Sequence, residues 1–259
     1  MASNGGRLAI TYVGHATVLV EMGGARILTD PLLRSSFGPI RRVCPVPRPE
    51  QIGRVDGVVV SHLHHDHFDP RSLASLGNDL PVVVPSGAGV FAERAGLRGV
   101  VELGRGATLN IAGVRIEAVP AVHDGRRFPR GPRADAVGYR LAAEDRVVYF
   151  AGDTAIFGGM AALGPGVDAA LLPVWGWGPH LRGGHLTPRR AADAVRLIRP
   201  AFAIPIHWGT YWPTGLGWYR RGRLTAPAAE FQHHVEALGL PSTVVVLEPG
   251  HRWDLENDD

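Results

Sequence analysis

The feature that most constrains this chain is a run of ligand-type side chains that follows the apolar stretch 58–60 and Ser61: His62-Leu63-His64-His65-Asp66-His67. Side chains two positions apart in an extended strand point to the same side, so His62 and His64 can bind one ion together. If the chain then turns, Asp66 and His67 can face a second ion. Imidazole together with carboxylate suits zinc, manganese or iron. The run therefore predicts a metal site at the end of a buried strand.

Three further candidate ligands follow apolar runs later in the chain: His123, Asp153 and His207. Polar side chains placed just past buried strands are typical of sites at one rim of a sheet. Stray core or surface histidines seldom produce so dense a run. A structural zinc normally has a closed, Cys-rich set of ligands. Because the chain has a single cysteine, Cys44, the pattern favours a functional centre with enough ligands for two ions.

Apolar patterning predicts a chain rich in short strands. The runs 8–13, 17–22 and 26–29 form an expected meander with a hairpin turn at Gly23-Gly24. The Pro- and Arg-rich stretch 31–49 is expected to be a loop. Later strands are expected at 55–61, 81–84, 100–103, 108–121, 137–142, 146–150, 169–174, 201–206 and 242–248.

Two helices are expected between the later strands. Thr187-Pro188 has the pattern of an N-cap followed by proline in the first turn. A second helix is expected from near Thr225 to Gly239. This order of strands and helices suits an α/β fold in which two mixed sheets pack face to face with helices on the outer faces, a four-layer αββα sandwich. We expect one domain over residues 1–259.

Charge and composition narrow the range of partners. All 27 basic residues are Arg, and the formal net charge is only +3. A small positive charge spread along the chain does not favour a nucleic-acid partner, so a small-molecule substrate is expected. Residues 1–7 lack a secretory pattern, no apolar run is long enough to span a bilayer, and the lone cysteine gives no sign of an oxidising compartment. We expect a cytoplasmic protein; peripheral lipid contact and a homo-oligomer stay open.

The run and the later candidate ligands together resemble the signature of the metallo-β-lactamase superfamily. The match extends from Gly14-His15-Ala16-Thr17 to His207-Trp208-Gly209-Thr210. It is most similar to the branch that contains ascorbate-phosphate lactonase and N-acylphosphatidylethanolamine phospholipase D, although segment 124–130 lacks the Trp-rich continuation of the phospholipase. The resemblance implies the following ligands: His62, His64 and His123 for a first ion, Asp66, His67 and His207 for a second, and Asp153 for both.

Several further residues are candidates for orienting these ligands or the substrate. Asp30 and Asp69 could accept a hydrogen bond from a metal-bound histidine, or could instead serve as capping or turn residues. His15 is expected near the site. By the resemblance, His185 is an active-site histidine that orients substrate or donates a proton; the alternative is a solvated loop histidine.

Aromatic and basic residues near these positions are candidate substrate contacts. A set of large aromatic side chains flanks His185 and His207 and could surround the mouth of a pocket, or could be ordinary loop packing: Trp175, Trp177, Trp208, Tyr211 and Trp212. Arg126 and Arg127 lie beside His123 and could grip a phosphate or carboxylate, or could lie in a solvated loop.

The chemistry implied is hydrolysis with two divalent metal ions, with zinc as the first choice and manganese or iron as alternatives. Two cations that share a water lower its pKa toward neutrality, and Asp66 would hold and deprotonate that water as well as bind metal. The expected substrate is a phosphodiester or lactone that is small, anionic and partly apolar. A mononuclear iron dioxygenase on the same fold and a non-catalytic metal-binding interaction module are the alternatives.

Overall fold

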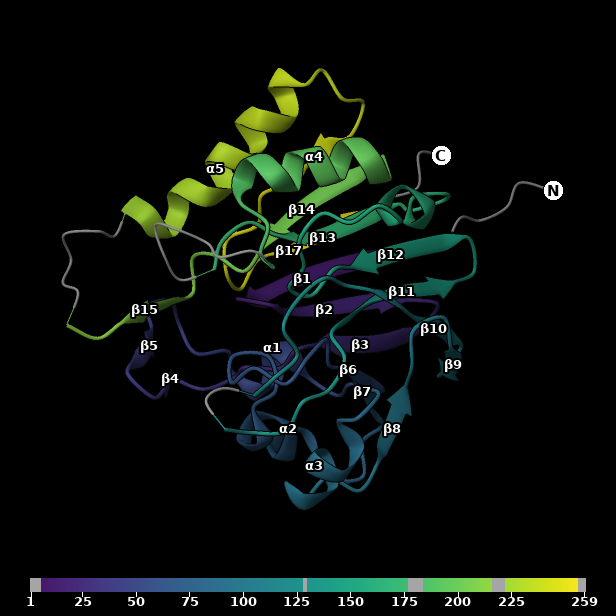
Figure 1. The fold of residues 1–259 in the computed structure, drawn as a ribbon, viewed down its shortest axis with the longest axis vertical. Helices are drawn as coiled ribbons and strands as arrows, with labels where there is room; N and C mark the ends of the chain where they lie inside the picture. The colour runs from purple at the N-terminus through teal and green to yellow at the C-terminus, as the bar shows by residue number, and fades with distance from the viewer. Residues whose placement is uncertain (1–5, 128–129, 177–183, 216–221, 256–259) are drawn as a thin grey trace.

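The computed structural model describes residues 6–127, 130–176, 184–215 and 222–255. Two seven-stranded sheets pack face to face (Figure 1). In spatial order, the first sheet consists of β17 (Arg252–Leu255), β1 (Leu8–Gly14), β2 (Thr17–Met22), β3 (Ala25–Thr29), β6 (Gly57–Val59), β7 (Val82–Pro85) and β8 (Val100–Leu103). The second consists of β16 (Thr243–Val244), β14 (Phe202–Ile206), β13 (Ala169–Pro173), β12 (Arg146–Phe150), β11 (Val137–Ala143), β10 (Val114–Pro120) and β9 (Thr108–Ile111).

Helices cover the outer faces of both sheets (Figure 1). The second sheet is covered by α4 (Pro188–Ile198) and α5 (Gly222–Ala237), with the short 3-10 helix η1 (Met160–Leu163) beside α4. The first sheet is covered by three short helices: α1 (Pro49–Ile52), α2 (Pro70–Leu76) and α3 (Gly89–Arg94). A small sheet of β15 (Tyr211–Pro213), β5 (Ile40–Arg42) and β4 (Ser36–Phe37) lies at one side of the sandwich. The expected αββα architecture is confirmed.

Each sheet is mixed, and its parallel part positions the chemistry. In the first sheet β3, β6, β7 and β8 are parallel neighbours, and in the second β12, β13, β14 and β16 are. Every residue of β7 and of β13 is buried, as expected for strands covered on both faces. Parallel neighbours end at the same edge of a sheet, so the residues that follow β3, β6, β12 and β14 come together.

Two apolar clusters hold the layers together. The larger fills the space between the sheets and extends to the buried face of α4, with Ile10, Val20, Leu141 and Val195 among its members. The smaller lies between the first sheet and its helices and includes Leu63, the residue between His62 and His64. Leu63 is fully buried, so the alternation predicted for the run is present: its side chain packs in the core while its neighbours are free to bind metal.

The structure corrects some of the predicted element boundaries. The run 108–121 is two strands, because Ala112 and Gly113 adopt φ of 49° and 90° and form a tight turn between β9 and β10. The predicted loop 31–49 contains β4 and β5, and only Thr243–Val244 of the predicted strand 242–248 pairs with a neighbour. The hairpin at Gly23-Gly24 and the Thr187 cap of α4 are confirmed. Among the described residues, no helix combines the length and apolar character needed to cross a membrane.

Candidate metal centre

The candidate ligands lie where strands end at the common rim of the two sheets. Residues 62–67 follow β6, His123 follows β10, Asp153 follows β12 and His207 follows β14. Within the described residues, they form two main groups that could each hold a cation. We name His62, His64 and His123 the histidine cluster. We name His15, Asp66, His67 and His207 the mixed cluster.

The histidine cluster consists of three imidazoles set edge to face. The ring planes of each pair are inclined at 77–78°, with centroids 4.5–4.8 Å apart. Nε2 of His123 lies 3.1 Å from Nδ1 of His64. The opposite nitrogen of His123, Nδ1, lies 2.8 Å from the carbonyl oxygen of Gly184, which fixes the ring orientation. The three ring nitrogens therefore converge on one point, as the ligands of a single cation must.

The mixed cluster is more deeply buried and includes a carboxylate. Nε2 of His67 lies 3.3 Å from Nε2 of His207, and Nε2 of His15 lies 3.1 Å from Oδ2 of Asp66. Oδ2 of Asp66 is 3.8 Å from the Nε2 atoms of both His67 and His207. Four side chains from three separate chain segments thus point at one small volume.

Asp153 lies between the two clusters. Its Oδ2 is 3.9 Å from Nε2 of His123, in the histidine cluster, and 3.4 Å from Nε2 of His67, in the mixed cluster. Its Oδ1 is 3.5 Å from Nε2 of His207. A carboxylate whose oxygens lie this close to imidazole nitrogens of both clusters is well suited to bind two cations at once.

Three residues at the centre have left-handed backbone conformations: His15 (φ 59°), Asp30 (φ 32°) and His207 (φ 65°). Side chains with a Cβ adopt this region at a cost of about 1–3 kcal/mol each, and such residues are concentrated at functional sites. The strain is offset here by hydrogen bonds: the amide of His15 donates to Thr210 Oγ1 (2.7 Å), and the amide of His207 donates to the His15 carbonyl (2.7 Å). The backbone is therefore held in the shape that aims these side chains inward.

The electrostatics of the histidine cluster favour neutral imidazoles. Burial and the neighbouring histidines hold the pKa of His62 well below its usual value and lower the pKa of His64 to about 4. Burial also lowers the pKa of His123, although Asp153 acts in the opposite direction. A histidine binds a cation only through an unprotonated nitrogen, so this cluster is ready to bind metal at neutral pH.

In the mixed cluster, opposite charges dominate. Burial acts to lower the pKa of His67, but Asp153, Asp66 and Asp30 together raise it well above its usual value. Burial acts to raise the pKa of Asp66, yet the nearby histidines, His67 first, hold it well below its usual value. Burial also acts to raise the pKa of Asp153, but His207 and His67 hold it well below its usual value. Both aspartates that face this cluster therefore carry negative charge. A site with two carboxylates attracts a divalent cation.

The residues present fit transition-metal ions. Nε2 of His62 is buried and has no hydrogen-bond partner among the residues that the structure describes, whereas its Nδ1 lies 3.0 Å from Ser61 Oγ. An unsatisfied buried polar atom costs about 1–3 kcal/mol, and a cation at the histidine cluster would satisfy it. The donor atoms are imidazole nitrogens and carboxylate oxygens, which suit zinc, manganese and iron.

Asp30 contacts a member of the mixed cluster directly. Its buried Oδ2 lies 2.6 Å from Nδ1 of His67 and accepts a hydrogen bond from the Ser61 hydroxyl (2.5 Å), while Oδ1 accepts one from the Ser61 amide (2.6 Å). Such a carboxylate sets the orientation and basicity of a ligand histidine. Sequence reasoning missed Ser61, which joins Asp30 to His62, and Thr210, which anchors His15; the position of Ser61 directly before the run was the available signal.

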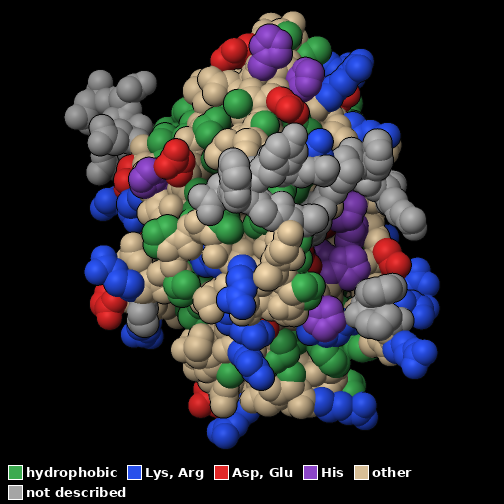
Figure 2. Space-filling view, turned by 90° about the vertical axis from the view of Figure 1, so that its left-hand side faces the viewer, with side chains coloured by type: hydrophobic (Ala, Val, Ile, Leu, Met, Phe, Trp, Pro, Cys, Tyr) green, Lys and Arg blue, Asp and Glu red, His purple; other side chains and the backbone are tan. Residues whose placement is uncertain are grey.

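His185 lies at the entrance to the centre. Its Nδ1 is 3.3 Å from Oδ2 of Asp153, its ring packs against His123 with centroids 4.7 Å apart, and its side chain is 23% exposed. His64 and His185 are half-buried, so the centre reaches the surface, and Figure 2 shows histidine side chains gathered in a column on one face of the molecule. His185 thus contacts both the buried carboxylate and the outside.

Asp69 and Arg127 contact protein groups outside the two clusters. Asp69 is the N-cap of α2: its Oδ2 accepts from the amide and hydroxyl of Ser72 (3.0 and 2.6 Å), and its Oδ1 pairs with Arg34 (3.0 Å). Of the two roles considered for Asp69, the structure shows the cap. The guanidinium of Arg127 donates hydrogen bonds to the backbone carbonyls of Leu63 and Phe68, whereas Arg126 is exposed.

The predicted aromatic residues divide between core and rim. Trp208 is buried, stacks on Tyr12 and donates from Nε1 to the Pro205 carbonyl (2.8 Å), so it belongs to the core. Buried Tyr211 packs edge-on against His15, with ring centroids 5.8 Å apart. Trp175 and Trp212 stack in parallel with centroids 6.1 Å apart and are half-buried. Trp177 lies outside the described residues.

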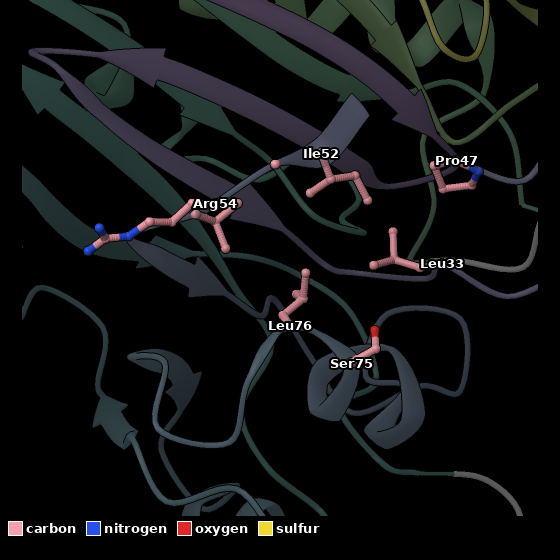
Figure 3. Close-up of a pocket in the computed structure, with 8 residues that line it drawn as sticks. Leu33, Pro47, Ile52, Arg54, Ser75 and Leu76 are labelled. Atoms are coloured by element: carbon pink, nitrogen blue, oxygen red, sulfur yellow. The ribbon is translucent and has the colours of Figure 1, made fainter. Parts of the chain in front are cut away.

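A surface pocket elsewhere has no comparable chemistry. It has a volume of about 290 Å³ and lies between segment 47–55 and α2 (Figure 3). Its lining is mostly apolar and includes no His, Asp or Glu: Leu33, Pro47, Ile52, Gly53, Arg54, Val55, Ser75 and Leu76. This pocket therefore lacks the ligand-type side chains found at the strand-end rim.

Comparison with known proteins agrees with this geometry. The family model of the beta-lactamase superfamily domain matches residues 25–208. A UPF0173 metal-dependent hydrolase of Methanopyrus kandleri is 32% identical over 262 residues, covering 95% of this chain and 100% of that protein.

Two solved structures share the fold. A metallo hydrolase of the archaeon Ignicoccus hospitalis superposes with a TM-score of 0.72 at 24% identity, over 97% of this chain and 100% of that one. CmlA, a diiron β-hydroxylase of Streptomyces venezuelae, gives a TM-score of 0.72 at 20% identity, over 98% of this chain and 54% of that one. On the family model and the Methanopyrus relative, the chain belongs to the metallo-β-lactamase superfamily and to its UPF0173 metal-dependent hydrolase family.

Proposed function

We propose that this chain uses two divalent cations, zinc as the first choice, to hydrolyse an ester-type bond in a small anionic and partly apolar substrate. The observation that carries the proposal is the position of Asp153, whose oxygens lie within 3.4–3.9 Å of imidazole nitrogens of both clusters. A single mononuclear or structural site would not need a carboxylate between two separate groups of ligands.

The proposed ligands follow from the same geometry. One cation is held by His62, His64 and His123, and the other by Asp66, His67 and His207, with Asp153 shared. His15 contacts Asp66 and packs on His207, with ring centroids 3.9 Å apart, so in this proposal it orients these two ligands. Asp30 orients His67 in the same way.

When bound, the two cations supply Lewis acidity that ionises water near neutral pH and stabilises charge on the oxygens of the bond that is cleaved. Side chains of the protein accept and donate the protons. Asp66 is ionised and is 15% exposed, so an oxygen of its carboxylate can orient a water and accept its proton. Burial acts to lower the pKa of His185, but Asp153 raises that pKa above its usual value. The ring of His185 therefore stays protonated over a wider pH range. His185 can then donate a proton to the leaving oxygen.

The rim residues support the proposed class of substrate. Exposed Arg126 lies three residues from His123 and offers a cation to a phosphate or carboxylate. The stacked pair of Trp175, just after β13, and Trp212, within β15, offers a flat apolar surface. Phosphodiesters and lactones with an apolar portion match both features. Segments such as Gly14-His15-Ala16-Thr17 and His185-Leu186-Thr187-Pro188 support the finer placement beside the ascorbate-phosphate lactonase and phospholipase D branch.

Elemental analysis joined to a substrate screen tests the proposal. After reconstitution with zinc, the protein is expected to hold about two ions per chain and to hydrolyse a member of a panel of phosphodiesters, lactones and carboxylic esters. Asp153→Asn should lose most of the activity, about a thousandfold, because several kcal/mol of metal assistance disappear. The exposed carboxylate variant Asp79→Asn is the control.

Two results would remove the proposal. A stoichiometry of one ion per chain that Asp153→Asn leaves unchanged would exclude a shared carboxylate. One iron per chain with substrate-dependent oxygen uptake and no hydrolysis would establish the dioxygenase alternative instead.

A further inference from the structure

Arg127 makes an unusual set of contacts with the back of the metal-binding run. Its Nη1 donates to the backbone carbonyls of Leu63 (2.8 Å) and Phe68 (2.9 Å), and its Nη2 lies 2.9 Å from Nδ1 of His65. The two carbonyls lie at the two ends of the segment 63–68. One guanidinium therefore joins the start and the finish of the segment that carries His64, Asp66 and His67.

Two aromatic rings hold this guanidinium in place. Its Cζ lies 5.7 Å from the ring centroid of Phe68 and 5.1 Å from that of Phe91 in α3, and these two rings contact each other with centroids 5.3 Å apart. Arg stacks on aromatic faces and donates several hydrogen bonds from one rigid plane, whereas Lys presents a single point charge. The site is built for the shape of an arginine as well as for its charge.

The backbone of segment 63–68 makes few other hydrogen bonds with the described residues. Two backbone hydrogen bonds close it from within, from the amides of His67 (3.1 Å) and Phe68 (2.8 Å) to the His64 carbonyl. Buried carbonyl groups need partners, and Arg127 provides one for both Leu63 and Phe68. By contrast, His62 lies before the segment and contacts Ser61, which Asp30 anchors. The conformation of the segment therefore depends on Arg127 more than that of His62 does.

We infer that Arg127 is a positioning residue that holds segment 63–68 in the shape that directs its three ligand-type side chains at the cations. This inference rests on the proposed two-cation function. Arg127 then does not bind an anionic substrate, because the guanidinium nitrogens that would contact a phosphate already form hydrogen bonds with the protein. The effect falls mainly on the mixed cluster, since Asp66 and His67 lie within the segment and His62 does not.

The experiment compares Arg127→Gln with Arg126→Gln, an exposed arginine one position away. Zinc affinity is measured by chelator competition, and amide hydrogen exchange of residues 63–68 is measured in the zinc-free protein. Arg127→Gln is expected to weaken zinc binding at the mixed cluster about 10- to 100-fold, as lost support of a ligand does, and to speed exchange at His67 and Phe68. Arg126→Gln should keep the wild-type values of both.

Substrate kinetics distinguish positioning from substrate binding. Positioning predicts a lower kcat for an anionic and a neutral substrate alike, whereas an anion clamp predicts a higher KM for the anionic substrate alone with zinc affinity unchanged. The latter result, or unchanged exchange and affinity in Arg127→Gln, would overturn the inference. A wild-type protein that binds no zinc would refute the proposed function, while the exchange result would still report on the segment.

Arg127→Lys covers the case in which Arg127→Gln does not fold. It keeps the charge and the apolar stem over Phe68 and Phe91 but loses the fork, so it should fold and still bind zinc about tenfold more weakly. Wild-type zinc affinity in a folded Arg127→Lys variant would also overturn the inference, because a point charge would then suffice.

Discussion

The histidine cluster and the mixed cluster lie side by side, yet they are built in different ways. The histidine cluster has three uncharged rings, and two of them come from alternate positions of the segment that follows β6. The mixed cluster takes residues from three separate segments, includes a carboxylate, and places His15 and His207 in strained backbone conformations. Two nearby positions of one segment supply most of the first cluster, whereas the second brings together side chains from three distant segments.

This difference bears on how each cluster would bind a cation. A cation at the histidine cluster meets neutral nitrogens that burial keeps unprotonated. A cation at the mixed cluster meets carboxylates that are already paired with His67, so binding there must replace a proton. The two positions should therefore differ in affinity, in pH dependence and in their sensitivity to distant substitutions.

The largest effect is expected from removing one ligand of each cluster in turn. His123→Ala and His207→Ala should each bind one zinc fewer than the wild type and lose about 100- to 1,000-fold in kcat, because each loses several kcal/mol of metal assistance. Elemental analysis beside steady-state kinetics measures this, with His233→Ala on the exposed face of α5 as the control. If either variant loses both ions together, the clusters form one inseparable site and the comparison is wrong.

A smaller effect is expected from Asp30→Asn, which weakens the support of His67. The substitution removes the charge beside His67 Nδ1, and zinc affinity at the mixed cluster should fall about 10- to 100-fold while the histidine cluster keeps its ion. Asp69→Asn is the matched control, because asparagine still caps α2 and Asp69 bonds to Ser72 and Arg34. Equal loss of zinc from both clusters of Asp30→Asn would show that Asp30 supports the whole rim through Ser61.

The smallest effect is expected from a change of one pH unit. The pKa of His64 is lowered to about 4, so zinc affinity of the histidine cluster should stay nearly constant from pH 8 to about 5. The pKa of His67 is raised, so below that pKa zinc must displace a proton, and affinity at the mixed cluster should fall about tenfold per pH unit. Calorimetry in buffers of different ionisation enthalpy counts the released protons. Equal proton release when zinc binds at the two clusters would contradict the difference in protonation between them.

The parts of the centre that are local in sequence could be predicted from the sequence. The alternation in His62-Leu63-His64 indicates two side chains on one side and a buried leucine between them, and the structure has that arrangement. Asp153 and His207 could be selected because each follows a buried strand. The fold class followed from the same patterning of strands and helices, and it is confirmed.

What could not be predicted is the direction in which individual side chains point. Trp208 and Trp212 are four residues apart and have the same chemistry, but one packs on Tyr12 in the core and the other stacks on Trp175 at the rim. Arg126 and Arg127 are adjacent, yet only Arg127 reaches back to the run. The direction of each of these side chains depends on contacts with residues distant in sequence, which a local sequence pattern does not show.

The pairing of β1 with β17 affects the order of events during synthesis. Leu8 lies opposite Leu255, so the outer neighbour of β1 leaves the ribosome long after β1 itself. His207 likewise emerges 145 residues after His62, since 207 − 62 = 145. Contacts between such distant segments form slowly because a long loop must close first. The cation centre therefore cannot be complete until β14 and His207 have been synthesised, and the first sheet cannot be complete until β17 has been synthesised.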